Sequence, residues 1–297
     1  MTIPQDYNQP HIPVMLSEVT QYLNLQRDGV YLDGTVGAGG HAAQILDQLS
    51  SHGRLIGLDR DAEALDICND RFGASARPIS THQKSYHQFP EILQELDVPE
   101  VNGILLDLGL SSMQLDSDMR GFAFESEGNL DMRFNGDTGE TASDLISQLS
   151  EKELTEIIFQ YGEERHSRKI ARSIKAMKSM TTVADLKEAI RRSTPPQQRY
   201  KSLARVFQAL RIAVNGELDK LKSFLDSFVD YLSINGRVVI MSYHSLEDRM
   251  VKHTFRALKQ AGKLNVLTKK PIIPSADEQA QNSRSRSAKL RAAERIA

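Results

Sequence analysis

The chain has 297 residues, of which 40% are hydrophobic and 26% charged, so it can form one large domain or two, and its net charge is only −2. A single cysteine, Cys68, excludes an intramolecular disulfide and a cysteine-based metal cluster, and the dispersed histidines argue against a metal site. No apolar run approaches the roughly twenty residues of a membrane span, and the first residues lack the pattern of an export signal, so we expect a cytoplasmic protein without a membrane partner.

Residues 30–49 have the pattern of a strand, a glycine-rich turn and a helix. Residues 30–32 are apolar, as in a buried strand, and apolar side chains recur at helical spacing over residues 41–49. In the turn between them, residues 33–40, Gly37, Gly39 and Gly40 permit positive φ angles and close approach of a ligand to the backbone. The N–H groups at the start of the helix should point into the same crevice.

Two later strands should end on a carboxylate, as the first one does. Residues 54–58 form an apolar run before Asp59, and residues 103–106 form another before Asp107. Because the carboxyl ends of parallel strands lie at one edge of a sheet, we expect Asp33, Asp59 and Asp107 to line one cleft. Asp59, about twenty residues after the glycines, is placed to accept both hydroxyls of an adenosine ribose.

Two adenosine cofactors suit this cleft. The sequence GAGGHA departs from the dinucleotide fingerprint GxGxxG only at its last position, and Asp59 suits NAD as well as S-adenosylmethionine. Asp33 is placed for the amino acid end of S-adenosylmethionine, and NAD sites have glycine and apolar residues where this chain has Asp33 and Asp107. These acids favour S-adenosylmethionine over NAD. The alternative is purely structural: the glycines would only form a turn, and the acids would only cap helices. This alternative can explain each feature alone, but it explains their combination poorly.

Asp107 also begins the polar loop DLGLSSMQLD, where the methyl acceptor of a methyltransferase must lie. The exocyclic amine of a nucleobase is a poor nucleophile because its lone pair is delocalised into the ring. A carboxylate or backbone carbonyl that accepts the amine protons localises this lone pair and stabilises the developing positive charge. Asp107 is therefore a candidate catalytic residue, a candidate cofactor ligand, or both.

The alternation of strands and helices stops after Asp107 and resumes at a strand expected over residues 237–241. About 130 residues lie between them, where one crossover helix needs a few tens. We therefore predict a doubly wound, mostly parallel α/β sheet of the Rossmann-like class I methyltransferase type, formed by residues 1–114 and 205–297. Residues 115–204 are predicted to form an inserted helical domain for substrate recognition. Its helices should start at Thr141 or Ser143, start again after the threonine pair at 181–182, and stop before Pro195 and Pro196.

Charge is divided unevenly along the chain. Residues 1–160 hold 9 basic and 26 acidic side chains, whereas residues 161–297 hold 28 and 13. Within the second part, residues 165–211 carry 13 basic and only 2 acidic side chains. Such a concentration of positive charge favours a nucleic acid partner. A solvated helix face would explain the apolar stripe of Ile170 and Ile174 but not the lack of compensating acids.

Two further segments could contact that partner. The loop over residues 116–139 places three aromatic side chains beside two arginines, as in an ordered lid that stacks on a base, although a disordered linker has a similar composition. These side chains are Phe122, Phe124, Phe134, Arg120 and Arg133. Residues 281–297 hold 5 basic side chains and 1 acidic side chain, and we expect a short basic strand there for phosphate contact.

Nine segments resemble, in order, the motifs of the bacterial MraW family: HIPVML, DGTVGAGGH, GILLDLGLSS, RGFAF, NLDMRF, YGEER, RVFQALRIAVNGEL, SYHSLEDR and SRSAKLRAAER. Members of this family transfer methyl from S-adenosylmethionine to cytosine N4 in small-subunit ribosomal RNA. The resemblance runs nearly end to end. It implies cofactor contacts from Gly39, Gly40, His41, Asp59, Asp107 and Gln114.

The chain departs from the family pattern at two aromatic positions. The family has Phe near the adenine after the third strand, and the best match here is Tyr86, with Phe89 as the alternative. Tyr243 stands where the family more often has Phe. His244 and Ser245 follow it at a strand end that faces the cleft, so they are candidates for catalysis or base contact. The alternative is that they cap the next helix.

The resemblance implies methyl transfer from S-adenosylmethionine to the exocyclic N4 amine of a cytosine in small-subunit (16S) ribosomal RNA. The protein would act as a monomer or homodimer, without a metal. A non-catalytic RNA-binding ribosome assembly factor is the alternative from another class. An NAD-dependent oxidoreductase is less favoured, because no set of residues for hydride transfer is visible and the basic insertion stays unexplained.

Overall fold

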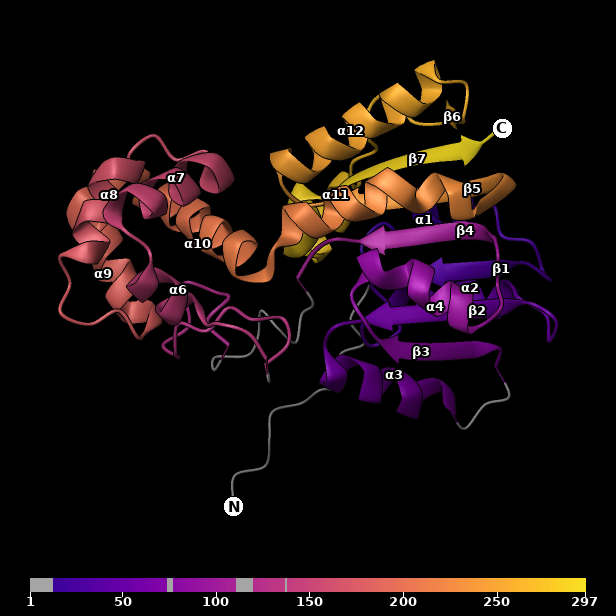
Figure 1. Cartoon of the computed structure of the whole chain (residues 1–297), viewed down its shortest axis with the longest axis horizontal. Helices are drawn as coiled ribbons and strands as arrows, with labels where there is room; N and C mark the ends of the chain where they lie inside the picture. The colour runs from indigo at the N-terminus through magenta and orange to yellow at the C-terminus, as the bar shows by residue number, and fades with distance from the viewer. Residues whose placement is uncertain (1–12, 74–76, 111–119, 137) are drawn as a thin grey trace. The chain divides into compact units, whose positions relative to one another are not determined.

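The computed structural model describes residues 13–73, 77–110, 120–136 and 138–297, which form two compact units (Figure 1). The sheet unit comprises Met1–Gly109 and Lys220–Ala297, and the helical unit comprises Leu110–Asp219. The helical unit therefore extends beyond Ala204, where the sequence suggested its end. The reason is that helix α10 (Arg199–Asn215) contributes Val206, Phe207 and Leu210 to the core of the helical unit.

The sheet unit contains a seven-stranded sheet in the order β3-β2-β1-β4-β5-β7-β6. The strands are β1 (Val30–Asp33), β2 (Arg54–Asp59), β3 (Ile79–Gln83), β4 (Val101–Asp107), β5 (Leu232–Ser242), β6 (Leu264–Val266) and β7 (Lys289–Arg295). Strands β1 to β5 pair in parallel, and β7 runs antiparallel to both β5 and β6. The strand order reverses direction between β1 and β4, which is where doubly wound sheets bind their ligands.

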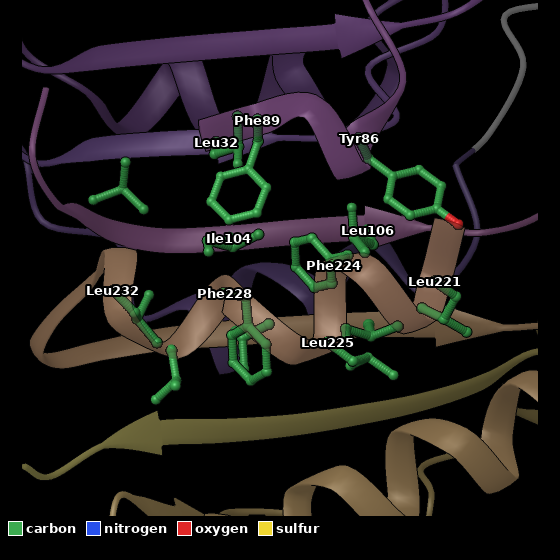
Figure 2. Packing of buried hydrophobic residues seen from close by; sticks show 14 of the residues in the cluster. Leu32, Tyr86, Phe89, Ile104, Leu106, Leu221, Phe224, Leu225, Phe228 and Leu232 are labelled. Atoms are coloured by element: carbon green, nitrogen blue, oxygen red, sulfur yellow. The ribbon is translucent and has the colours of Figure 1, made fainter. Parts of the chain in front are cut away.

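Helices cover both faces of this sheet. They are α1 (Leu16–Leu23), α2 (Gly40–Gln48), α3 (Ala62–Gly73), α4 (Phe89–Glu95), α11 (Glu217–Ser227, which begins at the unit boundary), α12 (Ser245–Gln260) and α13 (Ala276–Gln281). The cluster that includes Leu23, Ile45 and Leu65 fills one face, from α1, α2 and α3. Phe89, Phe224 and other side chains from α4, α11 and α12 fill the other face (Figure 2).

The second face is packed mainly by aromatic rings. The ring centroids of Phe89 and Phe224 lie 5.4 Å apart, and Phe224 stacks on Phe228 at the same distance. Full burial of one such side chain stabilises a fold by roughly 1.5–3 kcal/mol. This packing holds the strands in fixed register, and so it fixes the positions of the residues at their carboxyl ends.

The helical unit has its own apolar core. Its helices are α6 (Ala142–Gln148), α7 (Glu151–Gly162), α8 (Ser167–Lys175), α9 (Val183–Ser193) and α10. Thr141, Ser150 and Thr182 cap α6, α7 and α9, each in a reciprocal capping box that satisfies two N–H groups at the helix start. Thus Thr141, and not Ser143, is the cap of α6. Among the described residues, no helix is both long and apolar enough to cross a bilayer.

Four of the five side chains that suggested a base-stacking lid, all except Phe124, serve the fold instead. Phe122 and Phe134 are buried in the core of the helical unit and stack on each other with centroids 5.4 Å apart. Arg120 donates to the backbone oxygen of Phe134 at 2.6 Å, and Arg133 pairs with Asp131 at 2.8 Å. These two rings bury apolar surface and the two guanidinium groups hold the loop, so none of these four groups is presented to a base.

The expectation of a phosphate-binding strand at the C-terminus is also wrong for its central arginine. Strand β7 lies between β5 and β6, in the sheet rather than on its surface. Arg291 is buried, and its Nε lies 2.6 Å from a carboxylate oxygen of Asp248. Its charge is therefore neutralised within the fold.

Candidate cofactor and active site

Three carboxylates stand at the ends of neighbouring strands. Asp33, Asp59 and Asp107 are the last residues of β1, β2 and β4. Asp33 lies opposite Gly57 of β2 on one side and Leu105 of β4 on the other. The sequence pattern therefore brings the three acids to the edge of the sheet at which the strand order reverses.

The turn after β1 depends on glycine at two positions. Gly37 and Gly39 have φ angles of +50° and +82°, in the left-handed region that glycine adopts without strain. A Cβ atom on Gly39 would also meet the ring of Phe72 at 2.4 Å. Gly40 instead begins α2 with a negative φ and packs against Pro13, which a Cβ atom would meet at 2.8 Å. The turn thus holds its backbone N–H groups beside the carboxylates.

Asp33 is a buried carboxylate, with only 1% of its surface exposed. One oxygen accepts the backbone N–H of Thr35 at 3.1 Å. Burial raises the pKa of Asp33 to about 7; His41 and the Thr35 N–H oppose this shift, while Asp107 and Asp59 add to it. Near neutral pH this carboxyl group is therefore partly protonated, and an added cation beside it would stabilise its charged form.

Asp59 is held by two backbone N–H groups. One oxygen accepts from Gly37 at 2.9 Å and the other accepts from Asp61 at 2.9 Å. Burial raises its pKa above the ordinary value, and these two hydrogen bonds oppose the rise. Each carboxylate oxygen has a second lone pair, so the group can still accept two ligand hydroxyls.

His41 and Asp107 carry polar atoms that the described residues leave unsatisfied. His41 is 7% exposed, and neither of its ring nitrogens has a hydrogen-bond partner in the described parts of the chain. Its Nε2 lies 3.6 Å from Oδ2 of Asp107, and Oδ1 of Asp107 is buried without a partner among the same residues. Buried polar atoms of this kind are costly unless a ligand or water satisfies them. The site therefore fits a polar cofactor or substrate group.

Tyr243 contacts Asp107 from the end of β5. Its pKa is raised well above the ordinary value by burial first, then by the charge of Asp107 and the hydrogen bond to it. The ring lies against Gly109, where a Cβ atom would come within 2.7 Å. In the sequence, Tyr243 stands out only as a departure from the family pattern. The hydroxyl that distinguishes Tyr from Phe was the available signal for this contact.

Tyr86 and Phe89 differ in their distance from the edge of the sheet that carries the carboxylates. Tyr86 begins a short 3-10 turn after β3, and Figure 2 shows its ring near the carboxyl end of β4. Phe89 is fully buried further back along the sheet, between the rings of Phe224 and Tyr231. Of the two aromatic candidates for the adenine, only Tyr86 lies at the edge of the sheet that carries the carboxylates.

His244 caps helix α12. Its Nδ1 accepts the N–H of Glu247 at 3.3 Å, and an oxygen of Glu247 accepts the N–H groups of Tyr243 and His244 in return, at 2.9 and 3.3 Å. Ser245 is the first residue of the helix, so the cap expected from it is supplied by His244 instead. His244 Nε2 lies 3.2 Å from Glu247 Oε1 without forming a hydrogen bond, which leaves this nitrogen for a further partner.

Gln114, the remaining candidate cofactor residue, lies outside the described residues. The other candidates, Gly39, Gly40, His41, Asp59, Tyr86, Asp107, His244 and Ser245, all belong to the sheet unit. Apart from the two residues that follow β5, they are the last residues of β2 and β4 or lie in the segments that follow β1 and β3. A chain with this arrangement can bind an extended ligand along one edge of its sheet.

Comparison with known proteins agrees with this arrangement over nearly the whole chain. The MraW methylase family matches residues 8–296. Three relatives are each called ribosomal RNA small subunit methyltransferase H. The protein of Kosmotoga olearia is 45% identical over 98% of this chain and 99% of its own length, and that of Thermosipho africanus is 46% identical with the same coverage. The protein of Sorangium cellulosum is 43% identical over 99% of this chain and 93% of its own length. The chain belongs to the MraW methylase family.

Proposed function

We propose that this chain transfers a methyl group from S-adenosylmethionine to the exocyclic N4 amine of a cytosine in small-subunit ribosomal RNA. The observation that carries the proposal is the group of three strand-end carboxylates beside a glycine turn, in a chain of the MraW methylase family. The names of the relatives support ribosomal RNA as the substrate. The reaction would take place in the cytoplasm without a metal, carried out by a monomer or a homodimer.

The cofactor would be held along the edge of the sheet. Asp59 would accept the ribose hydroxyls, Tyr86 would contact the adenine, and the N–H groups around Gly39 and Gly40 would bind the amino acid carboxylate. Asp33 is suited to the ammonium group because its raised pKa falls when a cation binds beside it. His41 and Gln114 complete the proposed set. S-adenosylmethionine supplies a methyl group already activated by a sulfonium.

Asp107 would activate the methyl acceptor, which is the amine of the cytosine. Its buried Oδ1 can accept an N–H of the cytosine amine in a hydrogen bond, which localises the nitrogen lone pair and stabilises positive charge on the nitrogen. The N–C bond to the methyl group would form as the S–C bond of the sulfonium breaks, with S-adenosylhomocysteine as the leaving group and the surplus amine proton passing to Asp107 or to solvent. His244, through Nε2, and Ser245 would hold the base. The inserted helical unit, with its excess of basic side chains, would dock the RNA.

Transfer of labelled methyl groups tests the proposal. Purified protein is incubated with methyl-labelled S-adenosylmethionine and small ribosomal subunits from cells that lack the gene. Label should enter the RNA of these subunits, and subunits from cells with the gene should accept little because their target is already methylated. If neither kind of subunit, nor free ribosomal RNA, takes up label, the proposal is wrong and a non-catalytic assembly factor is the better description.

A further inference from the structure

Several arginines on the helical unit form ion pairs with acidic side chains. Arg191 and Arg192 both contact Glu188, at 2.6 and 2.8 Å, and Arg172 contacts Glu151 at 3.4 Å. Six other basic side chains on this unit are exposed and make no ion pair with any described residue. Two of them, Lys152 and Lys178, lie at the start of α7 and after α8. The other four, Arg165, Arg168, Lys169 and Lys201, are available for a polyanion on neighbouring segments of the unit.

These cations lie on two segments that a buried acid joins. Glu164 is 1% exposed, and its carboxylate accepts the N–H of His166 at 2.8 Å and the hydroxyl of Ser202 at 3.0 Å. Arg205 lies 3.6 Å from the same carboxylate, and the His166 ring bonds to Gln198 at 2.7 Å. The turn between α7 and α8 is therefore fastened to the start of α10. We call the exposed surface of these two segments the basic corner, with Arg165, Arg168, Lys169, Tyr200, Lys201 and Arg205.

An exposed aromatic ring stands in the basic corner. Tyr200 has 69% of its surface exposed, which is unusual for a large aromatic side chain. Its ring meets Phe124 edge-on, with centroids 5.3 Å apart and planes at 88°. Phe124 packs on the core of the helical unit, so it supports Tyr200 from one side. The ring is thereby held on the unit while most of its surface stays open.

We propose that the basic corner binds a single-stranded segment of the RNA substrate, with one base stacked on Tyr200 and neighbouring phosphates on the four unpaired cations. This inference rests on the proposed function, since it assumes that the substrate is RNA. An aromatic platform among lysines and arginines is the combination that binds unpaired nucleotides, because every base has a face that stacks and every nucleotide carries a phosphate. A duplex offers no free base faces, so it should gain only from the charges.

The helical unit supplies a matched control for the aromatic ring. Phe159 on α7 is also exposed, at 60%, but Glu156 lies one helical turn before it and Glu163 is the C-cap of the same helix. Acidic neighbours would repel phosphate, so this ring should not take part in RNA binding. Tyr200→Phe keeps the aromatic platform and removes only the hydroxyl.

The test is fluorescence anisotropy with a labelled single-stranded oligocytidylate and with an RNA duplex of equal length. Tyr200→Ala should weaken binding of the single strand by about tenfold, within the range for loss of one stacked base. Binding of the duplex should change little, and Tyr200→Phe and Phe159→Ala should bind the single strand like the unaltered protein. Circular dichroism of each variant checks that the helices are intact. Equal single-strand affinity of Tyr200→Ala and Phe159→Ala would overturn the proposal, as would an equal loss for single strand and duplex.

Methyl transfer to small subunits, measured on the same preparations, separates this inference from the proposed function. If the unaltered protein methylates subunits and Tyr200→Ala does so with an unchanged KM for subunits, the basic corner is not the docking surface although the function stands. If the unaltered protein binds oligocytidylate through Tyr200 but transfers no methyl group, the proposed function fails while the RNA-binding surface stands.

Discussion

At the scale of single residues, Asp33 combines nearly complete burial with a pKa of about 7. A buried carboxylate that has no permanent cationic partner is a cost to the fold whenever it is charged. In a binding site the same group gains most from a ligand cation. If Asp33 binds the ammonium group as proposed, cofactor binding and the stability of the protein are linked through this residue.

Asp33→Asn should make the ligand-free protein more stable at alkaline pH. The folded-state pKa lies above the ordinary value of 3.8, so the native state binds the extra proton between these two values. Stability contributed by this proton is present at low pH and is lost as pH rises toward about 7. Denaturant unfolding near pH 8 should show a gain on the order of 2 kcal/mol for Asp33→Asn, and little gain near pH 4.

The control for this variant is Asp66→Asn, because Asp66 is an exposed acid on α3. It should leave unfolding unchanged at both pH values. Asp33→Asn should also weaken binding of S-adenosylmethionine, since it removes the proposed partner of the ammonium group. A variant that is no more stable than the unaltered protein at alkaline pH would show that the Asp33 carboxylate is not strained by burial.

Asp59→Ala should weaken S-adenosylmethionine binding by roughly a hundredfold, because charge-assisted hydrogen bonds to two ribose hydroxyls are lost. Isothermal titration calorimetry measures the affinity. The carboxylate also accepts the N–H groups of Gly37 and Asp61, so circular dichroism must show that the variant is folded. An unchanged affinity in a folded variant would remove Asp59 from the cofactor site.

His244→Ala decides between the two uses of its ring. If Nε2 holds the base, the rate of a single turnover with saturating cofactor should fall by about 10² or more, a typical contribution of one acid or base group. His253→Ala on the exposed face of α12 is the matched control and should keep the normal rate. A near-normal rate for His244→Ala in a stable protein would leave the residue as a helix cap only.

At the scale of secondary structure elements, helix α8 combines an apolar stripe with exposed cations. Ile170 and Ile174 are buried in the core of the helical unit, whereas Arg168 and Lys169 are exposed. Changing Arg168, Lys169 and Arg172 together to Gln should weaken RNA binding and flatten its dependence on salt, since each phosphate contact contributes about 0.7 to 0.9 to the slope. Anisotropy over a series of salt concentrations measures that slope.

Arg191→Gln with Arg192→Gln is the matched comparison for α8, because both of these arginines already pair with Glu188. This pair of substitutions should change the slope less than the substitutions on α8. Cofactor affinity should stay the same in both variants. If the α8 variant keeps the full salt dependence of RNA binding, the cations of α8 make no phosphate contacts and only form a solvent-exposed helix face.

How much of this structure the sequence predicted depends on the kind of element. The strands β1, β2 and β4, the turn after β1 and the caps at Thr141 and Thr182 were predicted, because local patterns determine them. The roles of Arg291 and the phenylalanines before α6 were not. An ion pair with Asp248 and a stack between two rings join residues that local patterns do not connect.

In the candidate site, too, features set by local patterns were predicted and long-range contacts were not. The convergence of Asp33, Asp59 and Asp107 follows from the rule that parallel strands end at one edge. The hydrogen bond between Tyr243 and Asp107 joins the end of β5 to β4 across more than a hundred residues of sequence, so the Tyr243 hydroxyl signals a polar contact but not its partner. The sequence suggested both a base contact and a helix cap for His244 and Ser245, but it did not show that His244 is the cap, because that geometry depends on how Glu247 folds back.

At the scale of the whole molecule, the chain interrupts its sheet after β4 to build a second core and then returns to β5. The long stretch between the strands predicted this insertion, but its predicted end at residue 204 lies too early in the chain. The apolar residues of α10 did not show from the sequence alone which of the two cores they join. The division suits an enzyme that binds its cofactor on a rigid sheet and its RNA on a separate basic unit. That separation is why cofactor affinity and RNA affinity should respond to different substitutions.

The most direct test of the central claim is the chemical identity of the product. Small subunits from cells lacking the gene are incubated with the protein and S-adenosylmethionine, their RNA is digested to nucleosides, and the nucleosides are separated by liquid chromatography and mass spectrometry. We predict new N4-methylcytidine, which is absent when Asp107→Asn replaces the unaltered protein at saturating cofactor. Methylation at carbon 5 of cytosine, at a ribose hydroxyl or at another base, or no methylated nucleoside at all, would contradict the account.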